Sequence, residues 1–257
     1  MAMRLLAVSD DGRFIQERFA KDSIPPYAIL SHRWSIHEDD EVTFKEIAMG
    51  ICDKKKPGYN KLQFCNGQAK ADGLNYFWVD TCCIDQSDQN ELSVAIYSMF
   101  RWYQKADRCY VYLADVAEES ALSESKWFSR GWTLQELLAP EVAEFYTRDG
   151  VRLGDKSSLD LQIAEITDIP ILALRGRSLS RFTPEEIFGW VESRHTKIAE
   201  DKAYCLLGVF NVSMLLDYGE GEKMAFSRLY REIENRVPGK YSFLMLNSMC
   251  CLSAMFA

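Results

Sequence analysis

The stretch 125–140, SKWFSRGWTLQELLAP, carries one carboxylate, Glu136, four residues after Trp132. Because residues four apart share a face of a helix, this spacing places an acid beside a large flat ring. Such a pair can hold a sugar or a base close to a negative charge. The spacing is also typical of a buried tryptophan next to a solvated glutamate on an amphipathic helix, so further evidence must separate the two interpretations.

Two more polar clusters follow apolar runs that are predicted to be buried strands. The first cluster is Ser31, His32, Arg33 and Trp34, and the second contains Asp80, Cys82 and Asp85. In an open parallel sheet, ligands lie beyond the carboxyl ends of the strands. If the two strands are neighbours, Arg33 and Asp80 face one pocket and offer a phosphate partner and a hydroxyl acceptor. The alternative is that Asp80 caps its loop and Arg33 makes a surface ion pair.

Short apolar runs predict the strands that position these clusters. They span residues 27–31, 76–80, 109–113 and 142–147. An amphipathic helical pattern lies in each interval between the first three runs, so we expect parallel pairing. The clearest helix spans 88–106, where Asp88 and Glu91 fit a capping arrangement. Its apolar face is formed by Leu92, Ala95, Ile96, Met99 and Tyr103.

Beyond about residue 155 the pattern predicts helices only. One helix begins after Thr183, with Pro184 at its first position and Glu186 placed to reach back to the cap. Further helices are predicted for 201–210 and 222–236. Since no repeat or low-complexity linker intervenes, we expect the helical part to pack on the α/β part as one unit.

Composition narrows the class of protein. With 257 residues, 47% apolar and 26% charged, the chain is predicted to be globular. The formal net charge of -8 argues against binding of nucleic acid or anionic lipid, because phosphate recognition needs clustered lysine and arginine. The apolar stretch 241–257 is too short and too interrupted to span a bilayer, so no transmembrane segment is expected.

Cysteine usage predicts a cytoplasmic protein. The chain opens without a signal-peptide apolar region and can build an ordinary core, so the eight cysteines are expected to be reduced thiols. They form no CxxC pair, and the three histidines have no ligand spacing. We therefore expect no metal site.

Five sequence blocks together resemble the heterokaryon incompatibility (HET) domain of filamentous fungi. The blocks are YAILSHRW (27–34), YFWVDTCCIDQ (76–86), MFRWYQKADRCYVYLADV (99–116), WFSRGWTLQELLAP (127–140) and EDKAYCLLGVFNVSMLLDYGEGEKMAFSRLYREI (200–233). They resemble most the domains at the N-terminus of STAND-type (NLR-like) receptors. The resemblance implies a HET domain over 3–236, with an α/β part at 3–150, a mainly helical part at 151–236 and an apolar tail at 237–257.

This resemblance implies a fold and an activity. HET domains trigger cell death in non-self recognition and are regarded as relatives of the Toll/interleukin-1 receptor (TIR) domain, a flavodoxin-like parallel sheet flanked by helices. Many TIR domains hydrolyse NAD, with a motif in which a glutamate follows a tryptophan by four residues, as Glu136 follows Trp132 here. Thr133 and Arg130 depart from the motif, which has cysteine and serine there. NAD is thus the candidate substrate, and no permanently bound cofactor is expected.

In the implied reaction, Glu136 stabilises the positive charge that builds on the ribose as nicotinamide leaves. Trp132 or Trp34 would supply an aromatic wall, and Arg33 a contact to the pyrophosphate. Self-association and a linked or separate STAND/NACHT receptor are the implied partners. The alternatives are a scaffold that acts by assembly alone and a receptor that binds a nucleotide without cleaving it.

Two further polar pairs, in the region 194–201, are interpreted as stabilising the fold rather than binding a ligand. Arg194 and Thr196 match a family element, as do Glu200 and Asp201. Acids in the first turn of a helix complement its dipole, which explains the second pair without a ligand.

Overall fold

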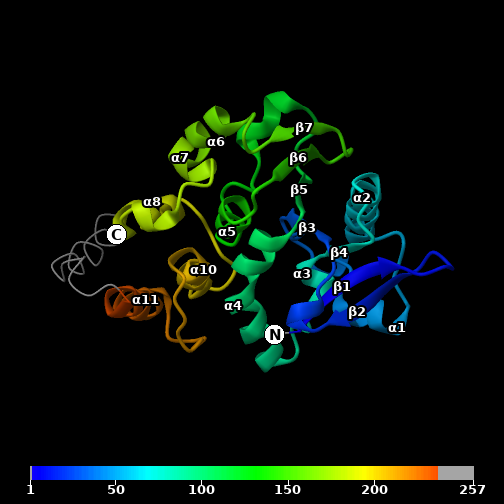
Figure 1. Ribbon diagram of the computed structural model, residues 1–257, viewed down its shortest axis with the longest axis horizontal. Coiled ribbons are helices and arrows are strands. Elements are labelled where there is room, and N and C mark those ends of the chain that lie inside the picture. Colours follow the sequence, from blue (N-terminus) through cyan, green and yellow to red (C-terminus); the bar gives the residue numbers. More distant parts are fainter. Residues whose placement is uncertain (1, 237–257) are drawn as a thin grey trace.

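A mixed sheet of seven strands runs through the domain in the computed structural model, which describes residues 2–236 (Figure 1). The strands are β1 Met3–Val8, β2 Phe14–Phe19, β3 Tyr27–His32, β4 Tyr76–Trp78, β5 Arg108–Leu113, β6 Ala143–Thr147 and β7 Arg152–Asp155. Their order is β2-β1-β4-β3-β5-β6-β7. The four central strands, β4, β3, β5 and β6, are parallel, and the outer strands pair antiparallel. The predicted α/β class, strands and parallel pairing are confirmed.

Helices cover both faces of the sheet. They are α1 Phe44–Met49, α2 Pro57–Ala71, α3 Asp80–Cys83, α4 Gln89–Lys105, α5 Thr133–Leu138, α6 Asp160–Thr167, α7 Ile171–Leu174, α8 Pro184–Glu192, α9 Asp201–Tyr204, α10 Leu207–Phe210 and α11 Glu222–Arg236. Figure 1 shows α2 on one side of the parallel strands and α4 and α5 on the other. The helices from α8 onward lie beyond α4 and α5, so the C-terminal part extends that layer.

Capping explains where the predicted helices begin. The Asp88 side chain accepts from the backbone N–H groups of Asn90 and Glu91, as expected of an N-cap. The reciprocal half of a capping box does not form, because the Glu91 carboxylate accepts from the Asp85 backbone N–H and pairs with Arg4 of β1. Thr183 starts α8 with a full capping box, which confirms that prediction. The predicted helix 201–210 is interrupted and forms α9 and α10.

Side chains alternate across the central strands and fill two separate layers. Tyr110 of β5 and Tyr146 of β6 surround Phe64 of α2 with edge-on ring contacts. Phe145, next to Tyr146, points to the opposite face and contacts Trp127. The same alternation separates the two polar residues at the end of β3, where the candidate site lies.

The hairpin of β1 and β2 was not predicted from the sequence. MRLLAV is apolar apart from Arg4 and does not alternate, and FIQERF carries charges because β2 is an edge strand. The cysteines among residues 2–236 are free thiols. No helix in that range is long and apolar enough to cross a membrane. The predicted tail 237–257 lies outside the described residues.

The helical C-terminal part packs on the α/β part through α10 and α4, as predicted. Gly208 of α10 lies directly against Phe100 of α4, and a Cβ at this glycine would come within 2.2 Å of the Phe100 Cβ atom. Gly208→Ala is therefore expected to lower the free energy of unfolding by about 1–3 kcal/mol. Urea denaturation measures this loss. Gly189→Ala is the control, because a Cβ there meets no atom within 4 Å, and an equal loss in both variants would contradict the packing argument.

Candidate functional site

Two polar centres branch from the end of β3. Ser31 and His32 are consecutive strand residues, so their side chains point to opposite faces of the sheet. Ser31 faces the layer of α4 and α5, and His32 faces the layer of α2. Arg33 and Trp34 continue beyond the strand. The four residues predicted as one cluster thus serve two buried centres and the loop between them.

The first centre joins Ser31 to Glu136. The Ser31 hydroxyl donates to Glu136 Oε2 at 2.5 Å and accepts from Trp127 Nε1 at 2.9 Å. Tyr103 of α4 lies beside them and donates its hydroxyl to the Leu30 carbonyl at 3.0 Å. Glu136 is only 4% exposed. The carboxyl group is therefore enclosed between β3, α4 and its own helix α5.

Burial is the main cause that raises the pKa of Glu136 to about 8. The Ser31 hydrogen bond and the charge of Arg130 act in the opposite direction, and Asp80 adds to the rise. A group with this pKa carries its proton at neutral pH in the folded domain. The site therefore holds a neutral carboxylic acid in this conformation.

The second centre is a buried ion pair beneath the loop that follows β3. Lys61 of α2 places Nζ at 2.5 Å from Glu41 Oε1 and 3.1 Å from the Arg33 carbonyl oxygen. His32 Nε2 lies at 3.8 Å from the other Glu41 oxygen. Burial alone raises the pKa of Glu41, but interactions with His32 and Lys61 outweigh it and hold that pKa well below its ordinary value. The loop is thus fixed by a charged pair.

A cleft of about 290 Å³ opens beyond the ends of β3 and β5. Its lining residues are Arg33, Trp34, Ser35, Ile36, His37, Pro57, Lys61, Tyr112, Leu113, Ala114, Asp115 and Trp127. From β3 the chain leaves toward β4, and from β5 toward β6, so the cleft lies at the topological switch point, where parallel α/β sheets bind ligands. We call it the switch-point cleft.

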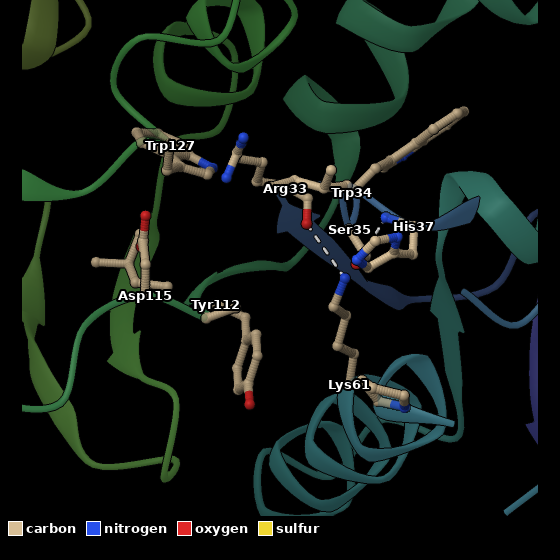
Figure 2. A pocket seen from close by; sticks show the side chains of 12 residues that line it. Arg33, Trp34, Ser35, His37, Lys61, Tyr112, Asp115 and Trp127 are labelled. Atoms are coloured by element: carbon tan, nitrogen blue, oxygen red, sulfur yellow. Dashed lines mark hydrogen bonds between the residues drawn. The ribbon is translucent and has the colours of Figure 1, made fainter. Parts of the chain in front are cut away.

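Figure 2 shows the Arg33 side chain extending toward Trp127, while Trp34 extends away from it. The Arg33 guanidinium forms no ion pair among residues 2–236. Trp127 lines the cleft and also hydrogen-bonds Ser31, so one side chain links the cleft to the Glu136 centre. The cleft thus contains the Arg33 cation, and the neutral carboxyl group of Glu136 lies behind Trp127, which lines the cleft.

The predicted residues after β4 lie outside the cleft lining. Asp80 is close to the first cluster, since it accepts from Trp34 Nε1 at 2.6 Å and lies 3.9 Å from His32 Nδ1. The Cys82 thiol is buried against the Val42 carbonyl, and burial raises its pKa well above the usual range. Asp85 caps the turn before α4 by accepting from Ser87.

Trp132 belongs to a separate polar contact, at the start of α5. Its indole Nε1 donates to Asp201 Oδ2 at 3.1 Å, and Tyr218 donates to the other oxygen at 3.0 Å. Glu200 accepts from the backbone N–H groups of Gly219 and Gly221. These contacts tie the loop around 217–221 to the start of the helix that carries Glu136.

Sequence reasoning missed Trp127, Glu41 and Lys61 as members of the site. Trp127 lies in the same block as Trp132, and its spacing to Glu136 gives no sign that its indole reaches Ser31. Glu41 and Lys61 lie 20 residues apart on separate elements, and only the folded chain brings them together. A lysine on the buried face of α2 was the one available signal.

Together these features define an α/β domain with a switch-point cleft and a buried acid beside it. Residues 27–123 match the family model of the heterokaryon incompatibility protein (HET). The chain is 47% identical over 246 residues to the vegetative incompatibility protein HET-E-1 of Podospora anserina. The aligned region covers 90% of this chain and 18% of that protein, so the chain spans about a fifth of its relative. No match was found among solved structures. The matched region is therefore a heterokaryon incompatibility (HET) domain.

Proposed function

We propose that this domain is the cell-death effector of a fungal vegetative incompatibility protein and acts in the cytoplasm. Support comes from its family and from its 47% identity to a protein named for vegetative incompatibility. Because that relative is far longer than the matched region, we propose that the domain works as part of a STAND/NACHT receptor. Self-association of the domain is the proposed activating event.

The proposed fold relationship is to the TIR domain. The parallel strands, numbered along the chain, lie in the order second, first, third, fourth. Flavodoxin-like sheets begin with this order and bind ligands at the same switch point. The antiparallel strands at both edges are additions to that pattern.

The proposed reaction is hydrolysis of NAD to nicotinamide and an ADP-ribose product. The observation that carries it is the buried Ser31–Glu136 hydrogen bond at the end of β3, linked to the switch-point cleft through Trp127. As the nicotinamide bond breaks, positive charge builds on the ribose and an ionised Glu136 stabilises it. Water then adds to the ribose carbon and releases a proton. Arg33, which has no ion-pair partner among residues 2–236, is available to the pyrophosphate.

This proposal requires the site to open. Glu136 is 4% exposed, and burial raises its pKa to about 8, so in the present conformation it is mostly neutral at pH 7. A neutral acid cannot supply the required negative charge. Displacement of Trp127 would hydrate the carboxyl and lower its pKa. A cleft of about 290 Å³ also holds only part of a dinucleotide, which favours an enlarged active form.

The second candidate is a non-enzymatic scaffold that acts by oligomerisation and partner recruitment. The burial of Glu136 favours it, because a carboxyl that never meets solvent can be a packing group. This candidate requires cell death to continue when Glu136 is replaced by glutamine.

Nicotinamide release by the purified protein at low and high concentration tests the reaction. We expect release by the wild type to rise more steeply than linearly with protein concentration. Glu136→Gln is expected to lower the rate at least about 100-fold, because it removes the charge placed at the ribose. The matched control is Glu144→Gln, which changes a carboxylate of β6 that pairs with Arg152. Equal rates in wild type and Glu136→Gln, or no release from forced oligomers, would favour the scaffold.

A further inference from the structure

Arg194 is a buried cation with no carboxylate contact among the described residues. It follows α8 and is 1% exposed. Its Nε donates to the Trp190 carbonyl at 3.0 Å, and Nη1 donates at 2.9 Å to both the Arg130 carbonyl and the Thr133 hydroxyl. Nη2 is buried and has no hydrogen-bond partner within residues 2–236. A spare buried N–H donor on a charged group is costly, which indicates a contact made in another state.

The guanidinium lies on the side of α5 that carries Glu136. Thr133, which accepts from Arg194, precedes Glu136 by three residues, and residues three apart share a helix face. Burial lowers the pKa of Arg194 to about 10, while Cys205 and Glu136 partly offset that decrease. The two side chains therefore interact electrostatically across the first turns of α5. Gln135 Nε2 is also buried without a partner in the described part of the chain, but it belongs to a neighbouring face.

Other groups that face Glu136 leave its ionised form short of partners. They are Ser31 of β3, Tyr103 of α4, Cys109 of β5, Asp80 of α3 and Arg130 before α5. Ser31 and Tyr103 favour ionisation as hydrogen-bond donors, whereas Asp80 disfavours it. Arg130 favours it but is only half-buried, so water screens its charge. Arg194, in contrast to Arg130, is a fully buried cation.

We propose that Arg194 is the charge partner that receives Glu136 when this carboxyl ionises, through its spare Nη2 donor. Ionising a buried acid without a partner is unfavourable, and a buried guanidinium with a free donor offsets that cost. Arg194 is thus a positioning residue for the carboxylate. The inference deepens the proposed function, but it concerns the protonation of Glu136 and can be tested without any NAD cleavage.

The test measures unfolding free energies by urea denaturation from pH 5 to pH 10, with and without the Glu136→Gln substitution in each background. In each background we compare the unfolding free energy of the chain that keeps Glu136 with that of the chain carrying Glu136→Gln. The difference between these two free energies changes with pH up to the pKa of Glu136 in the folded chain and levels off to a constant value above it. In the wild-type background we expect this near pH 8. With Arg194→Gln we expect the difference to level off at least about one pH unit higher, which corresponds to a tenfold smaller ionisation constant of Glu136 in the folded chain. Arg194→Lys keeps the positive charge but removes the Nη2 donor, so a smaller rise of the levelling pH is expected.

A purely structural arginine would lower stability equally in both members of a pair and leave the levelling pH unchanged, which would overturn the proposal. The proposal is also overturned if Arg130→Gln raises that pH and Arg194→Gln does not. If Arg194→Gln fails to fold, Arg194→Lys decides alone: a rise supports the proposal and an unchanged value overturns it. Because no ligand is added, an inactive enzyme does not affect the outcome.

Discussion

Glu136→Gln is expected to gain about 3 kcal/mol of stability relative to the wild type between pH 4.5 and pH 7. Burial raises the pKa of Glu136 from its ordinary value of 4.5 to about 8. The folded chain therefore keeps a proton that the unfolded chain releases, and the wild type loses stability as pH rises through this window. Glutamine does not titrate and can still accept the Ser31 hydrogen bond, so the variant avoids this loss.

Urea denaturation of both proteins at several pH values measures the effect. The pH dependence caused by all other titrating groups cancels in the difference between the two proteins, because both proteins contain these groups. Glu144→Gln, which changes the β6 carboxylate paired with Arg152, serves as the control variant. A constant difference between wild type and Glu136→Gln would mean that the carboxyl is already ionised in the folded domain. The proposed need for an opening step would then be unnecessary.

Sequence patterns were sufficient for the parallel core of the fold. Runs of aromatic and β-branched residues marked β3 to β6, and the N-cap residues Asp88 and Thr183 marked two helix starts. The hairpin of β1 and β2 was missed because neither strand alternates clearly. The predicted helix 201–210 divides into α9 and α10, since local periodicity does not reveal the break between them.

The candidate site was predictable only in part. The position of Glu136 near Ser31 agrees with the expectation that polar residues meet at the ends of parallel strands. Its enclosure could not be foreseen, because burial depends on Trp127 and Tyr103 from other elements. Asp80 lies near the predicted cluster, but the cleft forms between β3 and β5, on the other side of β3 from β4. Strand order, which local patterns do not encode, decides which loops share a cleft.

Lys61→Met is expected to lower the free energy of unfolding by about 3–5 kcal/mol, because it leaves the buried Glu41 carboxylate without its main partner. The Lys61 ammonium lies 2.5 Å from Glu41 and 3.1 Å from the Arg33 carbonyl, and both charged residues of the pair are 5% exposed. His32 remains near Glu41 but only at 3.8 Å, which is too far for a hydrogen bond. Urea denaturation at pH 7 measures the loss.

A second substitution separates the unpaired charge from simple loss of packing. Adding Glu41→Gln to Lys61→Met removes the stranded carboxylate, so the double variant is expected to recover more than half of the lost stability. Lys55→Met, at an exposed position in the turn before α2, should change stability by less than about 0.5 kcal/mol. If the double variant is as unstable as Lys61→Met, the hydrogen bond to the Arg33 carbonyl, rather than the ion pair, holds the loop that lines the switch-point cleft.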